Sequence, residues 1–306
     1  MRKVPPPIRI SDEKLLRRIR RIRRITALAC RLSGTAGRRI GRELIWSGPD
    51  GTVRLLAHNW DTGGIKPLYI NLHGGCFVYM GPEMDEPHMA RLARELDIRI
   101  LNVGYRLAPE HRFPKALQDV LFVLEHVCSN AEAFGVDRER IVLGGTSSGG
   151  NLSAAAQIRL AERGHVGLRG LVLICPILDL DTDPYLKPTP RQSIPPRTAR
   201  LFNAAYCRPE EARDPCVSPI FAAEEQLGAF PPTLVITGSE DALCTEGDQF
   251  ADRLDKAGVS VTHRRFLGGA HGFTHRKTPL AREAWSLVLR FLQERTGTPA
   301  APLPAY

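Results

Sequence analysis

Short apolar runs rich in β-branched residues alternate with helical stretches along most of the chain, and this alternation restricts the fold more than any other feature. Strands that alternate with helices are typical of a mostly parallel sheet with helices on both faces, so the sequence predicts the α/β class. The expected strands are 52–59, 67–73, 99–104, 140–144, 170–175, 232–238 and 259–266. The expected helices are 86–96, 114–130, 149–163, 244–257 and 279–296.

One interval interrupts the alternation. From Asp179 to Pro219 the chain is rich in proline and lacks apolar periodicity until 198–206. We interpret this interval as an insertion above the sheet. The ordinary composition of the chain, 43% hydrophobic and 25% charged, excludes a disordered or fibrous protein.

The net charge of +9 resides near the N-terminus, because residues 1–43 hold 14 of the 42 basic residues and only 3 of the 33 acidic ones. Apolar residues recur there at three- and four-residue steps from Leu15 to Leu32, with arginines between them. This pattern predicts an amphipathic helix that follows Ser11. The favoured interpretation is packing on the rest of the protein with a solvated arginine face, and the alternative is attachment to anionic lipid. We expect no binding of nucleic acid, since no base-reading or stacking elements accompany the arginines.

The cysteine pattern indicates the compartment. The number of cysteines is odd and they form no C-x-x-C pair, so the sequence predicts reduced thiols, no zinc site and a cytoplasmic protein. They are Cys30, Cys76, Cys128, Cys175, Cys207, Cys216 and Cys244. No apolar run approaches the length of about 20 residues that a membrane helix needs, so we expect neither membrane spanning nor secretion.

A candidate nucleophile lies in the segment Gly145-Thr146-Ser147-Ser148-Gly149, between the apolar strand 141–143 and a helical run. This is the G-x-S-x-G pattern in the strand-turn-helix context that it requires. Glycines flank the serine because the sharp turn brings neighbouring backbone too close for a Cβ. The pattern predicts that the hydroxyl of Ser147 stands clear of the sheet at the start of a helix.

A serine hydroxyl needs a base and an orienting acid to become a nucleophile. The strand 232–238 runs into Asp241, and the last strand leads through a glycine-rich segment to His271. The order Ser147, Asp241, His271 is that of α/β-hydrolases, with each residue at the carboxyl end of a strand. Glu240 and His275 are the alternatives for the acid and the base.

Acyl transfer also needs hydrogen-bond donors where the oxyanion develops. The strand 67–73 leads into His73-Gly74-Gly75-Cys76-Phe77, a close variant of the HGGG loop of lipases and esterases. The glycines allow amide groups of this loop to converge on one point. Gly74 and Phe77 are the candidate substrate contacts beside them.

These motifs together resemble the hormone-sensitive lipase family of α/β-hydrolases in its bacterial esterase branch. The resemblance covers roughly 67–273 and adds two further motifs to those above, Tyr105-Arg106-Leu107-Ala108-Pro109-Glu110 with Phe113-Pro114, and Gly150-Asn151-Leu152 after the nucleophile. It implies an α/β-hydrolase fold with a mostly parallel sheet of about eight strands and a helical cap. It also implies a carboxylic-ester hydrolase with Ser147 as nucleophile, His271 as base and Asp241 as its orienter.

The resemblance further implies oxyanion donors from the amides of Gly75, Cys76 and Ser148, and a structural rather than acid-base role for Arg106 and Glu110. It divides the chain into N-terminal cap helices in 1–45, core in 46–179, a cap insertion in 180–218, core in 219–297 and a flexible tail in 298–306. Dimers are common in this family, so the resemblance implies a possible homodimer. We expect no metal and no organic cofactor.

Four positions depart from the family pattern: Cys76 in place of a third glycine, Thr146 in place of the commoner Asp, and Ala242 and Thr245 in place of Pro and Asp. None removes a catalytic group, although the Cys76 side chain narrows the expected acyl pocket. We expect a small-molecule ester substrate with a short to medium acyl chain. The alternatives are a deacetylase, amidase or lactonase that uses the same residues, and a small-molecule binder with a hydrolase fold.

Overall fold

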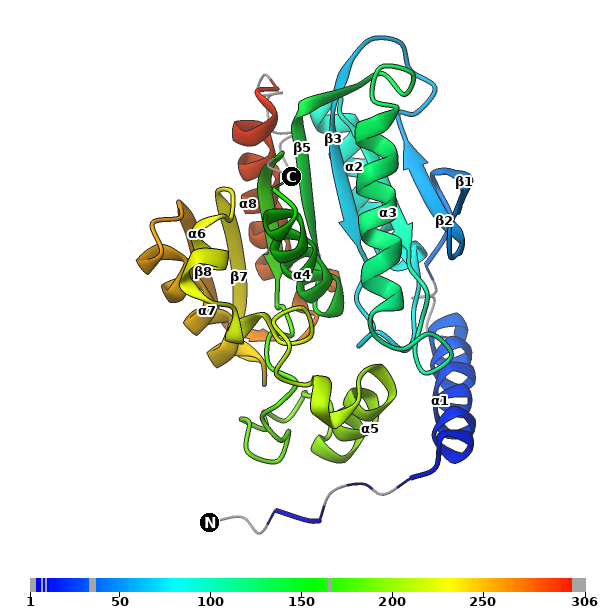
Figure 1. Ribbon diagram of the computed structural model, residues 1–306, viewed down its shortest axis with the longest axis vertical. Helices are drawn as coiled ribbons and strands as arrows, with labels where there is room; N and C mark the ends of the chain where they lie inside the picture. The colour runs from blue at the N-terminus through cyan, green and yellow to red at the C-terminus, as the bar shows by residue number, and fades with distance from the viewer. Residues whose placement is uncertain (1–3, 7, 9, 33–36, 165–166, 299–306) are drawn as a thin grey trace.

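The computed structural model describes residues 4–6, 8, 10–32, 37–164 and 167–298, and its centre is one sheet of 8 strands. The strands run in the order β1-β2-β4-β3-β5-β6-β7-β8 (Figure 1). Both pairs that contain β2 are antiparallel and the remaining pairs are parallel. The strands are β1 (Arg42–Gly48), β2 (Gly51–His58), β3 (Lys66–Leu72), β4 (Arg99–Gly104), β5 (Val136–Thr146), β6 (Leu168–Ile174), β7 (Thr233–Glu240) and β8 (Val261–Ala270).

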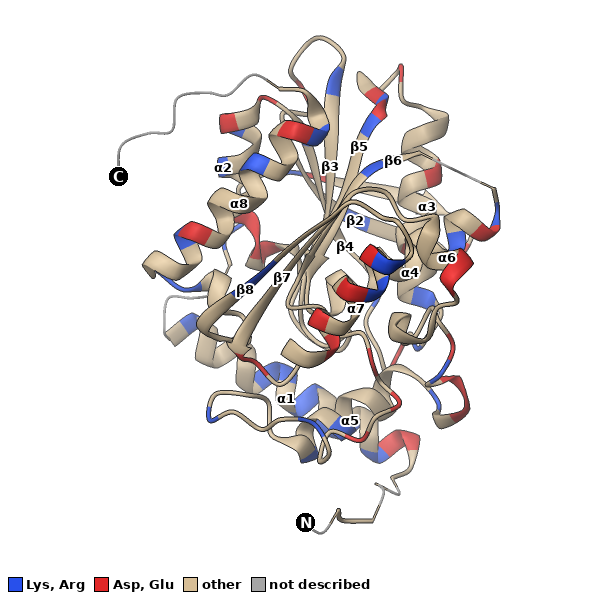
Figure 2. Ribbon diagram, turned by 90° about the vertical axis from the view of Figure 1, so that its left-hand side faces the viewer, with Lys and Arg blue, Asp and Glu red and all other residues tan. Residues whose placement is uncertain are grey.

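Helices cover both faces of the sheet. On one side lie α2 (Glu86–Leu96) and α8 (Pro279–Thr296), and on the other lie α3 (Lys115–Ser129), α4 (Ser148–Glu162) and α7 (Cys244–Lys256) (Figure 2). Successive residues of a strand therefore point to opposite faces of the sheet and pack into different hydrophobic cores. Leu68 and Ile70 of β3 pack into the core on one face, and Tyr69 packs into the core on the other. Such doubly covered strands are continuous apolar runs, which is why they were predictable.

The predicted fold class is confirmed, and every expected strand and helix of the core is present. The ends of β4, α2 and α8 are those predicted. β5 begins earlier than expected, at Val136, and β8 continues to Ala270. Among the described residues no helix combines the length and the apolar character needed to cross a membrane.

The sequence analysis missed strand β1, which pairs with β2 at the edge of the sheet. Leu44 and Trp46 are half-buried against the core, whereas Arg42, Glu43 and Ile45 between and before them are exposed. The strand was not predicted because it begins with charged residues and has one solvated face, so it is not a continuous apolar run. The strand begins at Arg42, inside the segment 1–45 that we predicted to form cap helices.

Two helices outside the sheet layers, α1 (Asp12–Leu32) and α5 (Pro196–Tyr206), lie together at the end of the sheet where the parallel strands terminate (Figure 1). α5 comes from the insertion, and α1 is the amphipathic helix, beginning directly after Ser11 as predicted. A short helix, α6 (Glu224–Gly228), follows the insertion. Of the tail predicted for 298–306, residues 299–306 lie outside the described part of the chain.

Candidate active site

Ser147 occupies a sharp turn between β5 and α4, as the glycine pattern predicts. Its φ of 58° and ψ of −114° are unfavourable for a residue with a side chain, and its amide donates to the carbonyl of Ile174 at 2.8 Å. A Cβ at Gly145 would lie 2.3 Å from the carbonyl oxygen of Leu72, and one at Gly149 would lie 1.9 Å from the same atom. Only glycine at both positions allows β3 to pack this closely against the turn.

The structure brings Ser147, His271 and Asp241 together from three strand ends. Nε2 of His271 lies 3.1 Å from Oγ of Ser147, and Nδ1 lies 2.8 Å from Oδ2 of Asp241. Oδ1 of Asp241 accepts the amide N–H of Leu243 at 3.0 Å, so the carboxylate is held at both oxygens. Burial lowers the pKa of His271, but the charge of Asp241 outweighs it and raises the pKa above its ordinary value of 6.5.

The two alternative residues lie elsewhere. Glu240 ends β7 with an exposed side chain, and no described contact joins it to His271. Nε2 of His275 lies 2.7 Å from Oδ1 of Asp85, a buried carboxylate that also accepts a hydrogen bond from Asn71 at 2.9 Å. His275 therefore anchors the segment that follows His271 and does not face Ser147.

The loop after β3 has the tight form that an oxyanion hole requires. Gly75, Cys76 and Phe77 have φ values of 123°, 50° and 64°, and a Cβ at Gly75 would lie 2.0 Å from the carbonyl oxygen of Tyr79. The amides of Val78 and Tyr79 donate to the carbonyl of Gly75 at 2.9 and 3.1 Å, whereas the amides of Gly75 and Cys76 have no backbone acceptor within the described part of the chain. Two residues with side chains in the left-handed region store strain, which is typical of functional loops.

The remaining predicted contacts lie beside the serine. Ser148 is the first residue of α4, so its amide belongs to the helix N-terminus, where anionic groups are favoured. A Cβ at Gly74 would lie 3.6 Å from Cβ of Ser147. The ring of His73, in contrast, stacks on Tyr105 at 4.3 Å and is fully buried, so it supports the loop from behind.

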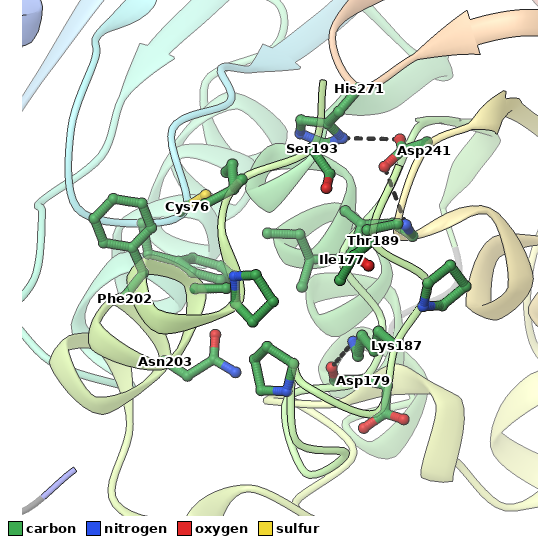
Figure 3. A pocket seen from close by; sticks show the side chains of 18 residues that line it. Cys76, Ile177, Asp179, Lys187, Thr189, Ser193, Phe202, Asn203, Asp241 and His271 are labelled. Atoms are coloured by element: carbon green, nitrogen blue, oxygen red, sulfur yellow. Dashed lines mark hydrogen bonds and ion pairs between the residues drawn. The ribbon is translucent and has the colours of Figure 1, made fainter. Parts of the chain in front are cut away.

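A pocket opens from His271 and Asp241 toward the insertion (Figure 3). Cys76, Phe77 and Phe202 line it with Ile177, while prolines of the insertion and Asn203 form its far wall. Phe77, a predicted substrate contact, stacks on Tyr206 of α5 at 3.6 Å. Burial raises the pKa of the Cys76 thiol to about 12, so this cysteine is a neutral wall of the pocket and not a second nucleophile.

Sequence reasoning missed a buried ion pair beside the pocket. Nζ of Lys187 lies 2.5 Å from Oε2 of Glu246 on α7, and it donates to the carbonyl of Asp179 at 2.5 Å. Oε1 of Glu246 accepts the amide of Leu178 at 2.7 Å. Burial nevertheless raises the pKa of Glu246 above its ordinary value. The pair ties the start of the insertion to the core, and a Lys and a Glu 59 residues apart give no signal in the sequence.

Asn151 fastens the other side of the insertion. Its side-chain amide donates to the carbonyls of Ile177 and Val217, both at 2.8 Å. Ile177 lies just before the insertion and Val217 lies near its end, and Asn151 lies one turn after Ser147 on α4. The asparagine of the Gly150-Asn151-Leu152 motif therefore fixes the pocket wall relative to the nucleophile.

Comparisons with known proteins identify the family of the fold. A family profile described as alpha/beta hydrolase fold matches residues 69–275. The chain is 30% identical to an arylesterase of Saccharolobus solfataricus over 213 residues, which is 67% of this chain and 68% of the relative. It is 29% identical to an esterase of Acinetobacter venetianus over 67% of each chain.

A solved structure is similar over more of the chain. The thermostable carboxylesterase EstE1, cloned from a metagenomic library, superposes with a TM-score of 0.82 at 30% identity, covering 91% of this chain and 97% of EstE1. The chain spans between 61% and 68% of the length of four curated relatives that it matches.

Proposed function

The chain belongs to the alpha/beta hydrolase family, in its hormone-sensitive-lipase-like branch, and from this membership we propose that it is a serine carboxylesterase. One observation carries the proposal. Ser147, His271 and Asp241 form a hydrogen-bonded chain with distances of 3.1 and 2.8 Å, and a pocket with apolar walls opens beside it.

The proposed reaction proceeds through an acyl-enzyme. His271 removes the proton of Ser147 as the hydroxyl oxygen attacks the ester carbonyl, and it then protonates the departing alcohol. Water, activated by the same imidazole, attacks the acyl-enzyme, and the carboxylic acid and free serine result. Asp241 stays ionised, holds the imidazole through Nδ1 and stabilises the imidazolium in both halves of the reaction.

Stabilisation of the oxyanion falls to backbone amides. We assign this role to Gly75 and Cys76, whose amides have no backbone acceptor among the described residues, and to Ser148 at the N-terminus of α4. Loss of one such donor in related chemistry costs about 10²–10³ in kcat. No side chain is needed at these positions, which is consistent with a cysteine in place of the commoner glycine.

The expected acyl group is short to medium. Cys76 lines the pocket on the side of His271, and Phe202 and Asn203 of the insertion line it farther from His271 (Figure 3). Segment 180–218 and helix α1 thus act as a cap over the carboxyl ends of the strands. A closed pocket of this kind limits acyl length, whereas a lipase that works on emulsions needs an open apolar face.

The test is hydrolysis of p-nitrophenyl acetate, butyrate, octanoate and palmitate by the wild type and by Ser147→Ala. We expect saturable activity on the short esters that disappears in the variant. Preference for emulsified long-chain substrates would contradict the acyl assignment. Inactivity on all esters, with Ser147 still labelled by a fluorophosphonate, would favour an amide, thioester or lactone substrate; absence of labelling would favour a small-molecule binder.

Helix α1 has a surface that packing on the core does not explain. Leu15 and Ile19 are buried, but Ile25, Leu28 and Leu32 are 58%, 58% and 80% exposed. Exposed apolar residues among arginines favour attachment to anionic lipid as a second role. In low salt, vesicles of phosphatidylserine should sediment the full chain but not a chain truncated before Ile45, and equal retention of both in the supernatant would exclude this role.

Two further expectations concern the setting of the enzyme. The odd number of cysteines and the lack of a C-x-x-C pair support a reducing, cytoplasmic location. The family resemblance supports a homodimer, which light scattering after size exclusion would detect as twice the mass of one chain.

A further inference from the structure

Arg23 differs from the other arginines of α1 because its guanidinium group reaches into the protein. Nε donates to the carbonyl of Val78 at 2.6 Å, and Nη2 donates to the carbonyl of Ala108 at 2.6 Å. Nη1 and Nη2 also bind the two carboxylate oxygens of Glu110, each at 2.9 Å. The side chain of Arg23 is 26% exposed, whereas those of Arg17 and Arg20 are 65% and 57% exposed.

The carbonyl of Val78 belongs to the strained loop that follows β3. The amide of Val78 donates to Gly75 inside the loop, while its carbonyl faces α1 and accepts from Arg23. The neighbouring carbonyl of Phe77 accepts the amide of Ala108 at 2.9 Å. Arg23 and Ala108 therefore hold adjacent peptide groups of the loop from its outer side, and Arg23 also binds the carbonyl of Ala108 itself.

We propose that Arg23 is a positioning residue for the oxyanion hole: helix α1 holds, through this side chain, the loop whose amides stabilise the transition state. The inference rests on the proposed function, because it assumes that the amides of Gly75 and Cys76 face the oxyanion. Gly75, Cys76 and Phe77 have positive φ values, and a loop strained in this way keeps its shape only where its surroundings fix it. The loop therefore needs an external support such as Arg23.

Glu110 fixes the guanidinium group of Arg23 in this position. Burial raises its pKa, but the hydrogen bonds and charge of Arg23 outweigh burial, so the pKa lies below 4.5 and the carboxylate stays ionised at neutral pH. The planar fork of an arginine can bind two carbonyls and a carboxylate at once, whereas a lysine ammonium acts as a single point. Arg106 of the same motif has a different partner, Asp119, at 2.7 Å.

The test compares Arg23→Gln with Arg24→Gln, a neighbouring arginine whose side chain is exposed. Two rates are measured for each: hydrolysis of p-nitrophenyl butyrate, as separate kcat and KM, and the second-order rate of Ser147 labelling by a fluorophosphonate. The phosphoryl oxygen of the probe occupies the oxyanion position, so labelling reports the hole without a substrate.

For Arg23→Gln we expect kcat and the labelling rate to fall together, by about 10- to 100-fold, because a loop displaced by about 1 Å costs this much. KM should change less than about twofold. Arg24→Gln should match the wild type in every rate. Arg23→Lys should lie between the two, because it keeps the charge but loses the fork.

A correctly folded Arg23→Gln with wild-type rates would overturn the inference and leave the esterase proposal standing. A wild type that is labelled but hydrolyses no ester would remove the esterase proposal, and the labelling rates would still decide the role of Arg23. If circular dichroism shows that Arg23→Gln does not fold, Arg23→Lys decides, and wild-type rates in that variant would refute the inference. Failure of the wild type to be labelled would overturn both.

Discussion

Replacing Asp241 by asparagine is expected to stop catalysis, because it moves the ring proton of His271 from Nδ1 to Nε2, while the fold stays intact. Oδ1 of Asp241 accepts the amide N–H of Leu243 at 3.0 Å, and Oδ2 binds Nδ1 of His271 at 2.8 Å. An asparagine amide has one oxygen that accepts and one nitrogen that donates. Because the amide of Leu243 can only donate, it keeps the new oxygen, and the new NH₂ group faces His271.

That orientation forces the wrong tautomer. The NH₂ group donates to Nδ1, so the ring proton moves to Nε2, which lies 3.1 Å from Oγ of Ser147. A protonated Nε2 cannot accept the serine proton. In serine hydrolases this loss amounts to about 10⁴ in kcat, or about 5 kcal/mol of transition-state stabilisation. Stability should change by no more than about 1 kcal/mol, since both hydrogen-bond sites stay occupied.

The assay is kcat on p-nitrophenyl butyrate with thermal unfolding measured in parallel. Glu240→Gln is the matched control, because it makes the same chemical change one residue earlier at an exposed side chain, and we expect its kcat to stay within about twofold of the wild type. If Asp241→Asn kept more than about a tenth of the wild-type kcat at an unchanged unfolding temperature, the tautomer argument would be refuted.

Three other changes test the site and its surroundings. Since Asp241 raises the pKa of His271 and only the neutral imidazole is a base, activity should rise with pH through a midpoint above 6.5, and a midpoint at or below that value would contradict the assigned pair. Cys76→Gly should raise the ratio of kcat/KM for octanoate over acetate about tenfold by opening the pocket, and an unchanged ratio would show that Cys76 does not limit acyl length. Lys187→Met leaves the buried carboxylate of Glu246 without its cation, so urea denaturation should show a loss of about 3 kcal/mol at neutral pH, and no loss would mean that the pair is not coupled.

The catalytic geometry was predictable because each of its members follows a local pattern. Ser147 lies between a strand and a helix with glycines on both sides, and the strand ends fix Asp241 and His271 at the same edge of the sheet. Glycine is required at Gly145 because a Cβ there would lie only 2.3 Å from the carbonyl oxygen of Leu72. Because this steric requirement excludes every other residue type, the motif can be recognised in the sequence.

The edge strand β1 and the long-range contacts that hold the pocket and its loop have no recognisable local sequence pattern. Arg23 reaches Val78 across 55 residues, Lys187 reaches Glu246 across 59, and Asn151 reaches Val217 across 66. Arg23 is one of several arginines on α1 with the same local surroundings in the sequence. Only the three-dimensional arrangement shows which of them faces the loop.

The described contacts divide the chain into a part that performs the chemistry and a part that shapes it. The proton path through His271 lies wholly in the core, and no residue of the insertion or of α1 belongs to it. The insertion lines the pocket and α1 holds the oxyanion loop through Arg23. Changes in the insertion should therefore alter which ester is accepted, changes at Arg23 should alter the rate for every ester equally, and neither should move the pH midpoint that His271 sets.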